Sequence, residues 1–143
     1  ASSGIGEYLA YSYSKLNYCV GLAARREDKL NKVAKKCIEL GGEAIIYPLD
    51  VLDENLCSET INDFISLPGS IDAIYANAGI GSPDELSSGS ASVMNKILSV
   101  NILGVTNTVM PFIPHLKSSK SGKIVELAVK KTVEGHESES LYR

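Results

Sequence analysis

The chain has 143 residues, of which 44% are hydrophobic, and its 14 basic and 17 acidic side chains leave a formal net charge of −3. This length and composition suit one folded domain and argue against a disordered or low-complexity chain. The small net charge argues against recognition of nucleic acid or of an anionic membrane by electrostatics.

The cysteines predict a reducing compartment. Cys19, Cys37 and Cys57 are odd in number, scattered and flanked by apolar residues, which is typical of reduced core thiols rather than of a disulfide framework or a zinc site. No apolar run approaches the ~20 residues that cross a bilayer, and no cleavable signal pattern is present. We therefore expect a soluble, cytoplasmic protein with no membrane partner.

The first six residues form a glycine-rich bend ahead of a helical pattern. Gly4 and Gly6 allow a tight turn and the close approach of a ligand,. The helix predicted over residues 5–16 would direct free N–H groups at an anion such as a pyrophosphate, although a plain strand-to-helix turn has the same signature. A phosphate-binding turn follows a strand, so we expect that a strand is missing before Ala1.

Strand and helix patterns alternate along the rest of the chain. Apolar runs predict strands at 19–24, 44–49, 71–76 and 123–125, and helical spacing predicts helices at 30–38, after Asp53 and at 92–117,. The last of these would place one set of residues on one side: Met94, Ile97, Leu98, Asn101, Ile102, Val105 and Val109. Pro111 and Pro114 would bend or end it. The alternation predicts a doubly wound, parallel, three-layer α/β/α sheet in a single domain, residues 1–143.

Polar and glycine residues fall where the predicted strands end. Gly4, Gly6, Arg25, Asp50 and Asn77, with Gly79 two residues on, all lie at these positions. Ligands of open parallel sheets bind beyond the carboxyl ends of the strands. The clustering therefore predicts a nucleotide site.

Four segments, Ser3-Gly4-Ile5-Gly6, Leu49-Asp50-Val51, Asn77-Ala78-Gly79 and Val100-Asn101, together resemble the short-chain dehydrogenase/reductase family over residues 1 to about 125. The resemblance implies a Rossmann-like fold and hydride transfer between NAD(P)(H) and a carbonyl or alcohol. It also implies that Ser3, Gly4, Ile5 and Gly6 line the pyrophosphate and nicotinamide side of the cofactor. Asp50 would hydrogen-bond the adenine amino group with Val51 beside the ring, and Asn77, Ala78 and Gly79 would border the adenosine ribose. Asp50 could instead cap a turn, and Asn77-Ala78-Gly79 could be a loop entry.

The exit of the strand predicted at 19–24 favours NADP(H) over NAD(H). A carboxylate there would bind a ribose 2′-hydroxyl, whereas a guanidinium would pair with a 2′-phosphate. The sequence reads Ala24-Arg25-Arg26, with two arginines and no carboxylate. The alternative is that both arginines are a solvated helix approach, neutralised in part by Glu27 or Asp28.

The catalytic residues that the resemblance implies are only partly present. Asn101 matches a helix asparagine that holds a water in the proton relay, and its alternative role is to bond a neighbouring backbone. Where the family has a serine the chain reads Glu126-Leu127-Ala128-Val129, and Tyr142 has no lysine four residues later. Residues 126–134 could be an amphipathic helix displaced from later in the fold, with residues missing between Val125 and Glu126.

Three functions remain open from the sequence. The first is an NADP(H)-dependent oxidoreductase acting on a small carbonyl or alcohol substrate. The second is a non-catalytic nucleotide-binding or interaction module that lacks the Ser/Tyr/Lys set, and the third is a flavodoxin-like binding domain. Helix 92–117 resembles one that relatives use to form dimers and tetramers, so we expect a homodimer or homotetramer. His115 and His136 lie apart with no ligand cluster, and no metal is expected,.

Overall fold

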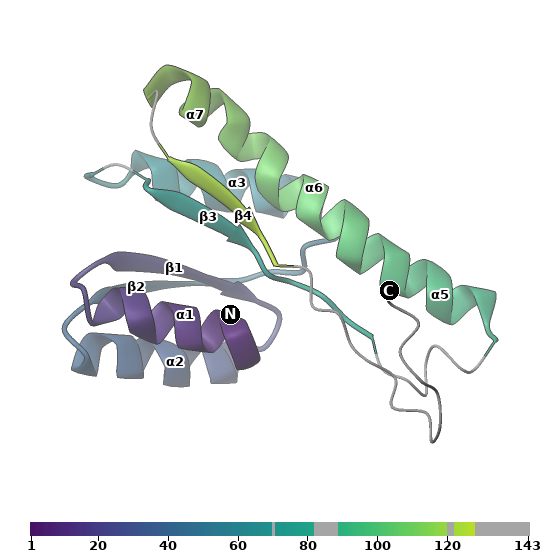
Figure 1. Ribbon diagram of the computed structural model, residues 1–143, viewed down its shortest axis with the longest axis horizontal. Helices are drawn as coiled ribbons and strands as arrows, with labels where there is room; N and C mark the ends of the chain where they lie inside the picture. The colour runs from purple at the N-terminus through teal and green to yellow at the C-terminus, as the bar shows by residue number, and fades with distance from the viewer. Residues whose placement is uncertain (70, 82–88, 120–121, 128–143) are drawn as a thin grey trace, which may run out of the picture.

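The computed structural model describes residues 1–69, 71–81, 89–119 and 122–127, which alternate between helices and strands (Figure 1). The first half comprises α1 (Gly4–Ser14), β1 (Cys19–Ala24), α2 (Glu27–Glu39), β2 (Glu43–Pro48) and α3 (Glu54–Ser66). The second half comprises β3 (Ala73–Ala76), α5 (Ala91–Leu98), the π-helical η1 (Ser99–Leu103), α6 (Gly104–Val109), the 3₁₀ turn η2 (Met110–Phe112), α7 (Ile113–Ser119) and β4 (Lys123–Glu126). This order confirms the predicted α/β fold class.

The strands form two parallel pairs. β1 pairs with β2 from Cys19↔Glu43 onward, and β3 pairs with β4, ending at Ala76↔Glu126. No strand among the described residues joins β1 to β3, and the two pairs lie apart in Figure 1. The predicted single sheet is therefore interrupted at its centre.

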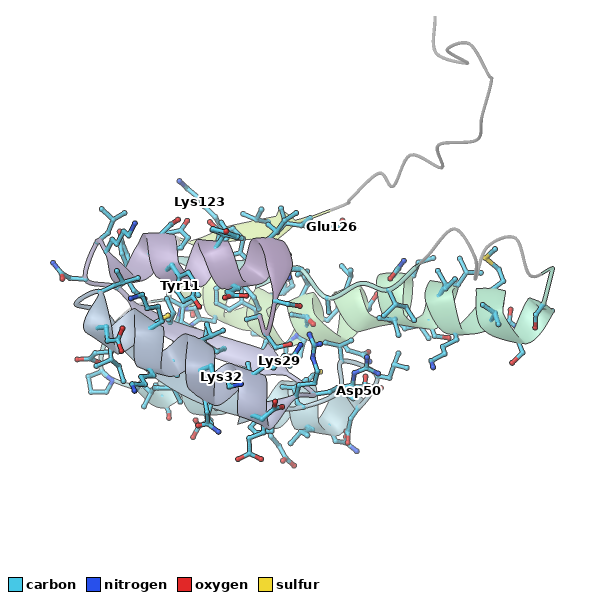
Figure 2. The ribbon with its side chains drawn as sticks, turned by 90° about the horizontal axis from the view of Figure 1, so that it is seen from below. Tyr11, Lys29, Lys32, Asp50, Lys123 and Glu126 are labelled. Atoms are coloured by element: carbon cyan, nitrogen blue, oxygen red, sulfur yellow. The ribbon has the colours of Figure 1, made fainter. Side chains whose placement is uncertain are left out.

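The core of the first half lies between α1, α2 and β1. The apolar face of α2 was predicted from its spacing, and its residues Leu30, Val33, Ala34 and Cys37 are buried with Ala10 and Leu22. Lys29 and Lys32 lie on the solvent side of the same helix (Figure 2). Burial of this one face is what holds α2 against the sheet.

Local features of the sequence define several helix ends. The Asp53 carboxylate accepts a hydrogen bond from the Leu56 N–H at 3.0 Å and caps α3,. Gly41 adopts a left-handed φ of 99° just after α2,. Gly42 lies so close to the end of α1 that an added Cβ would be 2.6 Å from the Ser14 Cα atom.

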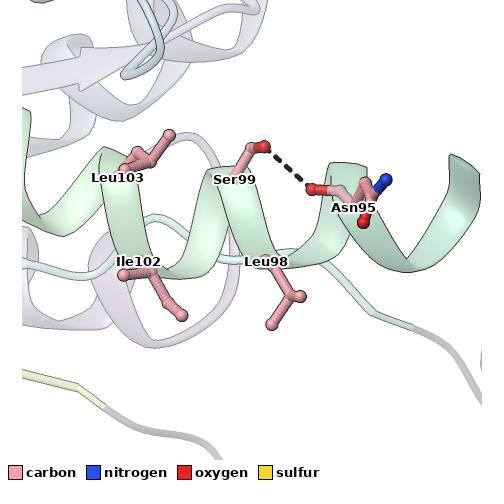
Figure 3. Close-up of a pocket in the computed structure, with 5 residues that line it drawn as sticks. All are labelled: Asn95, Leu98, Ser99, Ile102 and Leu103. Carbon is pink, nitrogen blue, oxygen red and sulfur yellow. Dashed lines mark hydrogen bonds between the residues drawn. The ribbon is translucent and has the colours of Figure 1, made fainter. Parts of the chain in front are cut away.

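The long helical region is continuous but buries a different face from the one predicted. It passes through both prolines, because Pro111 occupies the first turn of the 3₁₀ segment η2,. Its buried residues are Ile97, Val100, Gly104 and Phe112, whereas Met94, Leu98 and Ile102 are exposed. The exposed face carries a shallow hollow of about 270 Å³ lined by Asn95, Leu98, Ser99, Ile102 and Leu103 (Figure 3).

The expectation of a cytoplasmic protein is not supported, because the same helix is long and apolar enough to cross a membrane. Ala91–Ser119 is 29 residues long with a mean hydropathy of 1.4 in its most apolar window, of which 22% is buried inside the protein. By length and composition it could cross a bilayer. The sequence argument was wrong because it looked for an uninterrupted apolar run, whereas the polar residues of this helix are dispersed among apolar ones.

Two further expectations need correction. Cys37 and Cys57 are buried as predicted, but Cys19 is exposed, because it is the first residue of β1. Glu126 is not the start of a helix, since it pairs with Ala76 as the last residue of β4, and the Leu127 N–H donates to the Ala76 carbonyl. The rest of the predicted helix, and Tyr142 and His136, lie outside the described residues.

Tyr11 provides a pH-dependent test of this packing. Its hydroxyl donates to the Glu7 carboxylate at 2.7 Å, and chiefly this hydrogen bond raises the Tyr11 pKa to about 12. A raised pKa means that the folded state favours the protonated phenol. The stabilisation is therefore fully present below the ordinary tyrosine pKa of about 10 and is lost as the pH rises through about 12.

We expect Glu7→Ala to move the titration of Tyr11 back toward the ordinary range. An absorbance titration of tyrosinate in the wild type, Glu7→Ala and Tyr11→Phe checks this. An unchanged curve in Glu7→Ala would mean that the hydrogen bond does not form in solution.

Candidate functional site

The glycine bend lies against the residues that follow β3. Gly4, the first residue of α1, has a left-handed φ of 63°, which glycine adopts readily,. A Cβ on Gly6 would lie 2.6 Å from Nδ2 of Asn77 and 3.1 Å from the Cα atom of Ala1. The N-terminus of α1 and the carboxyl end of β3 are therefore in direct contact, as one bound molecule spanning both would require.

Arg26 holds the outer side of this bend. Its guanidinium donates to the Ser2 hydroxyl at 2.8 and 3.2 Å and to the Ser3 hydroxyl at 2.9 Å. Ser3 is the N-cap residue of α1 and uses no side-chain cap of its own. A cation thus lies beside the helix N-terminus, whose free N–H groups already favour an anion.

Arg25 points to a different partner. Its guanidinium lies 3.7 Å from the Asp50 carboxylate, and both side chains are substantially exposed, so the pair contributes little to stability. Asp50 also accepts a hydrogen bond from the Leu52 N–H at 3.1 Å, which is the turn-capping role that the sequence left open,. Figure 2 shows Asp50 at the same end of the sheet as Glu126, the carboxyl end of the strands.

Val51 is fixed against the long helix. Its carbonyl accepts a hydrogen bond from the Asn107 side chain at 2.9 Å. Gly104 makes room for its side chain, since an added Cβ there would be 2.6 Å from Cγ2 of Val51. The loop after β2 is therefore attached to α6.

Asn101 joins the π-helical segment to the loop after β3. Its amide Oδ1 accepts from the Ile80 N–H at 2.9 Å, and its Nδ2 donates to the Ile80 carbonyl at 3.0 Å. Gly79 lies next to it, with space for a Cβ at 3.4 Å from Oδ1. Asn101 thus forms hydrogen bonds with a backbone, which is the alternative role predicted for it. The residue that it bonds, however, is distant in sequence. The water-holding role stays a prediction.

The structure brings most of the predicted site residues to one end of the strands. Contacts link Ser3 to Arg26, Gly6 to Asn77, Arg25 to Asp50 and Gly79 to Asn101. Ile5 and Ala78 are exposed at the same end. Sequence reasoning missed Ser2, Asn107 and Gly104, and only Ser2 had a usable signal, because it adjoins the glycine bend.

A parallel α/β fold with a glycine bend at the carboxyl ends of its strands defines a Rossmann-like protein. Comparison with known proteins gives the family. The chain matches the short chain dehydrogenase family over residues 1–143, and it belongs to the short-chain dehydrogenase/reductase family of oxidoreductases, which act on small-molecule substrates.

Individual relatives agree with this assignment. The chain is 39% identical over 132 residues to 11-beta-hydroxysteroid dehydrogenase-like 2 of Arabidopsis thaliana, covering 90% of this chain and 42% of the relative. An alcohol dehydrogenase from the archaeon Thermococcus sibiricus, complexed with 5-hydroxy-NADP, is 31% identical with a TM-score of 0.79, covering 88% of this chain and 54% of that one. An NAD⁺-bound xylitol dehydrogenase, 22% identical with a TM-score of 0.81 over 88% of this chain and 49% of that one, shares the fold. The chain thus spans about two fifths to one half of the proteins it matches.

Proposed function

We propose that these residues form the cofactor-binding part of an oxidoreductase that transfers hydride between NADP(H) and a carbonyl or alcohol substrate. The observation that carries the proposal is the contact of Arg26 with Ser2 and Ser3 at the N-terminus of α1. A similar protein, the Thermococcus sibiricus alcohol dehydrogenase, was solved with 5-hydroxy-NADP.

The residues at the glycine bend fit a dinucleotide. A Cβ on Gly6 would meet Asn77 and Ala1, so glycine lets the start of α1 pack against the end of β3, and the N–H groups at that helix start would attract a diphosphate. Arg26 is exposed and has donors within reach of the bend, which suits a 2′-phosphate. Asp50 and Val51 lie at the end of β2, where the adenine would be held.

When bound, the cofactor supplies the hydride. The residues of this chain bind and orient it. The N–H groups at the start of α1 attract the diphosphate, and Arg26 neutralises the 2′-phosphate. Asn101 holds the Ile80 backbone, so that the loop following Asn77-Ala78-Gly79 keeps its place beside the ribose.

The coenzyme preference is tested with Arg26→Ala. Removing a charged hydrogen-bonding partner costs about 1.5–3 kcal/mol, which corresponds to about a tenfold to hundredfold loss of NADPH affinity. NADH affinity should change much less, because NADH has no 2′-phosphate. Titration calorimetry with both coenzymes measures the two affinities.

Arg25→Ala is the matched comparison, because Arg25 is equally cationic but pairs with Asp50. A loss confined to NADPH in either variant supports a phosphate role for that arginine. Equal losses of NADPH and NADH in both variants would contradict a phosphate role for either arginine and, with it, the proposed NADP(H) preference.

A second candidate function is a nucleotide-binding module without catalysis. It is favoured by the sequence after Val125, Glu126-Leu127-Ala128-Val129, which has alanine and valine where the family has serines. NADPH binding without oxidation of NADPH in the presence of a panel of aldehydes and ketones would support this module. Turnover of any of them would support the enzyme.

A further inference from the structure

Asn107 of α6 reaches the loop that follows β2. Its side-chain Nδ2 donates to the Val51 carbonyl at 2.9 Å, across a separation of 56 residues. A second donor to this carbonyl is the Cys57 thiol, whose Sγ lies 3.7 Å from it, and a thiol is a weak donor. The Asn107 amide is therefore the main group that fixes the direction of the Val51 carbonyl.

The peptide group that joins Val51 to Leu52 transmits this constraint. A trans peptide is planar, and its C=O and N–H groups point in opposite directions. Because the Val51 carbonyl is held toward α6, the Leu52 N–H is directed to the other side of the loop, where it donates to Oδ1 of Asp50 at 3.1 Å. Two hydrogen bonds thus connect the Asn107 side chain to the Asp50 carboxylate through one rigid group.

The Asp50 carboxylate can distinguish two kinds of purine base. Its Oδ1 accepts from the Leu52 N–H, and its Oδ2 lies 3.7 Å from the Arg25 guanidinium, so both oxygens have a fixed partner. A carboxylate accepts hydrogen bonds and donates none. The amino group of adenine can donate to it, whereas the carbonyl oxygen that hypoxanthine has at the same position is an acceptor and would be repelled.

We propose that Asn107 is a positioning residue for the base of the coenzyme, because it holds the Asp50 carboxylate, through the Val51–Leu52 peptide, in the orientation that selects adenine. This inference rests on the proposed function, in which Asp50 lies beside the adenine. Without the Asn107 amide the peptide would be free to rotate, and the Leu52 N–H would no longer hold Oδ1 of Asp50. The preference for adenine would then fall even where the coenzyme still binds.

The experiment measures base selection by titration calorimetry with NADPH and with its deaminated analogue, which carries hypoxanthine in place of adenine. The unchanged chain is compared with Asn107→Ala and Asn107→Leu. Leucine keeps the branched shape of asparagine but has no donor, so it serves if the alanine variant does not fold. Hydrogen exchange of the Leu52 amide is followed in every form without coenzyme.

Thr106→Ala is the matched control. Thr106 is the preceding residue of α6 and is exposed, and its hydroxyl donates to the Ile102 carbonyl of the same helical region at 3.2 Å. Its loss therefore leaves the loop after β2 untouched. A smaller folded fraction weakens the apparent binding of both coenzymes equally and leaves the ratio of their affinities unchanged, so the ratio separates positioning from a general loss of stability.

We expect the unchanged chain to bind NADPH about tenfold more tightly than the hypoxanthine analogue, because the analogue lacks a donor for a charged acceptor. In both Asn107 variants this ratio should fall below about threefold, and the Leu52 amide should exchange at least about tenfold faster. Thr106→Ala should change neither the ratio nor the exchange.

An unchanged ratio in the Asn107 variants would overturn the inference, as would an unchanged exchange rate of the Leu52 amide. Equal affinity of the unchanged chain for the two coenzymes would also overturn it, while still supporting the proposed function. Absence of binding to either coenzyme would contradict the proposed function itself, and the inference with it.

Discussion

Replacing Leu30 by alanine is expected to lower the free energy of unfolding by about 2–5 kcal/mol. Leu30 is 0% exposed and lies in the cluster formed by Ala10, Leu22, Val33, Ala34 and Cys37. The substitution removes three buried carbon atoms and leaves a cavity between α1, α2 and β1 that these short neighbours cannot fill. Urea unfolding followed by circular dichroism measures the change.

Lys29→Ala is the matched control for Leu30→Ala. Lys29 is the preceding residue of α2 and is exposed, so its loss should change stability by no more than about 0.5 kcal/mol. Similar effects for the two variants would mean that α2 does not bury this face. The whole free energy of unfolding of a domain is only about 5–15 kcal/mol, so Leu30→Ala could leave a substantial unfolded fraction.

Replacing Gly6 by alanine is expected to weaken NADPH and NADH binding equally, by about tenfold to hundredfold. The added Cβ would lie 2.6 Å from Asn77 Nδ2 and 3.1 Å from the Ala1 Cα atom. Such overpacking costs about 1–3 kcal/mol, and the start of α1 would have to shift to relieve it. If a comparable energy is lost from binding, the affinity falls tenfold for each loss of about 1.4 kcal/mol. The loss is common to both coenzymes because both contain the diphosphate that α1 would bind.

Tyr8→Ala is the control, since Tyr8 lies on the same helix with 73% of its surface exposed. Titration calorimetry with both coenzymes distinguishes Gly6→Ala from Arg26→Ala, which should weaken NADPH binding much more than NADH binding. Wild-type affinity for both coenzymes in Gly6→Ala would contradict a diphosphate at the glycine bend.

Local patterns were enough to predict most elements of the fold. The apolar run of β1 was located residue for residue at Cys19–Ala24, because few polar residues interrupt it. The buried stripe of α2 was predicted because lysines occupy its opposite face, and the cap at Asp53 because its carboxylate reaches the first turn,. In β1 and α2 the spacing of apolar and polar residues fits one kind of secondary structure much better than the other.

Where both sides of a helix are apolar, the side that is buried was predicted wrongly. The long helix has apolar residues on both sides, so spacing alone could not show that Ile97 and Val100 face the protein while Leu98 and Ile102 do not. The exposure of Cys19 depends on its position at the end of β1, and the apolar residues beside it in the sequence do not reveal this. The contacts of Arg26 with Ser2 and Ser3 depend on the packing of segments far apart in sequence. The sequence predicted only that such residues gather at one end of the strands.

The close approach of Gly104 to Val51, reinforced by the Asn107 amide, has a mechanical consequence. Asp50 precedes the clamped valine, and Asn101 lies one helical turn before the clamped glycine. A molecule that displaces the loop at Asp50 would therefore also displace the helix. The displacement would extend to Asn101 and to its hydrogen bonds with the Ile80 backbone. Under the proposed function, binding of the adenine near Asp50 would therefore be coupled, through the helix, to the position of Asn101.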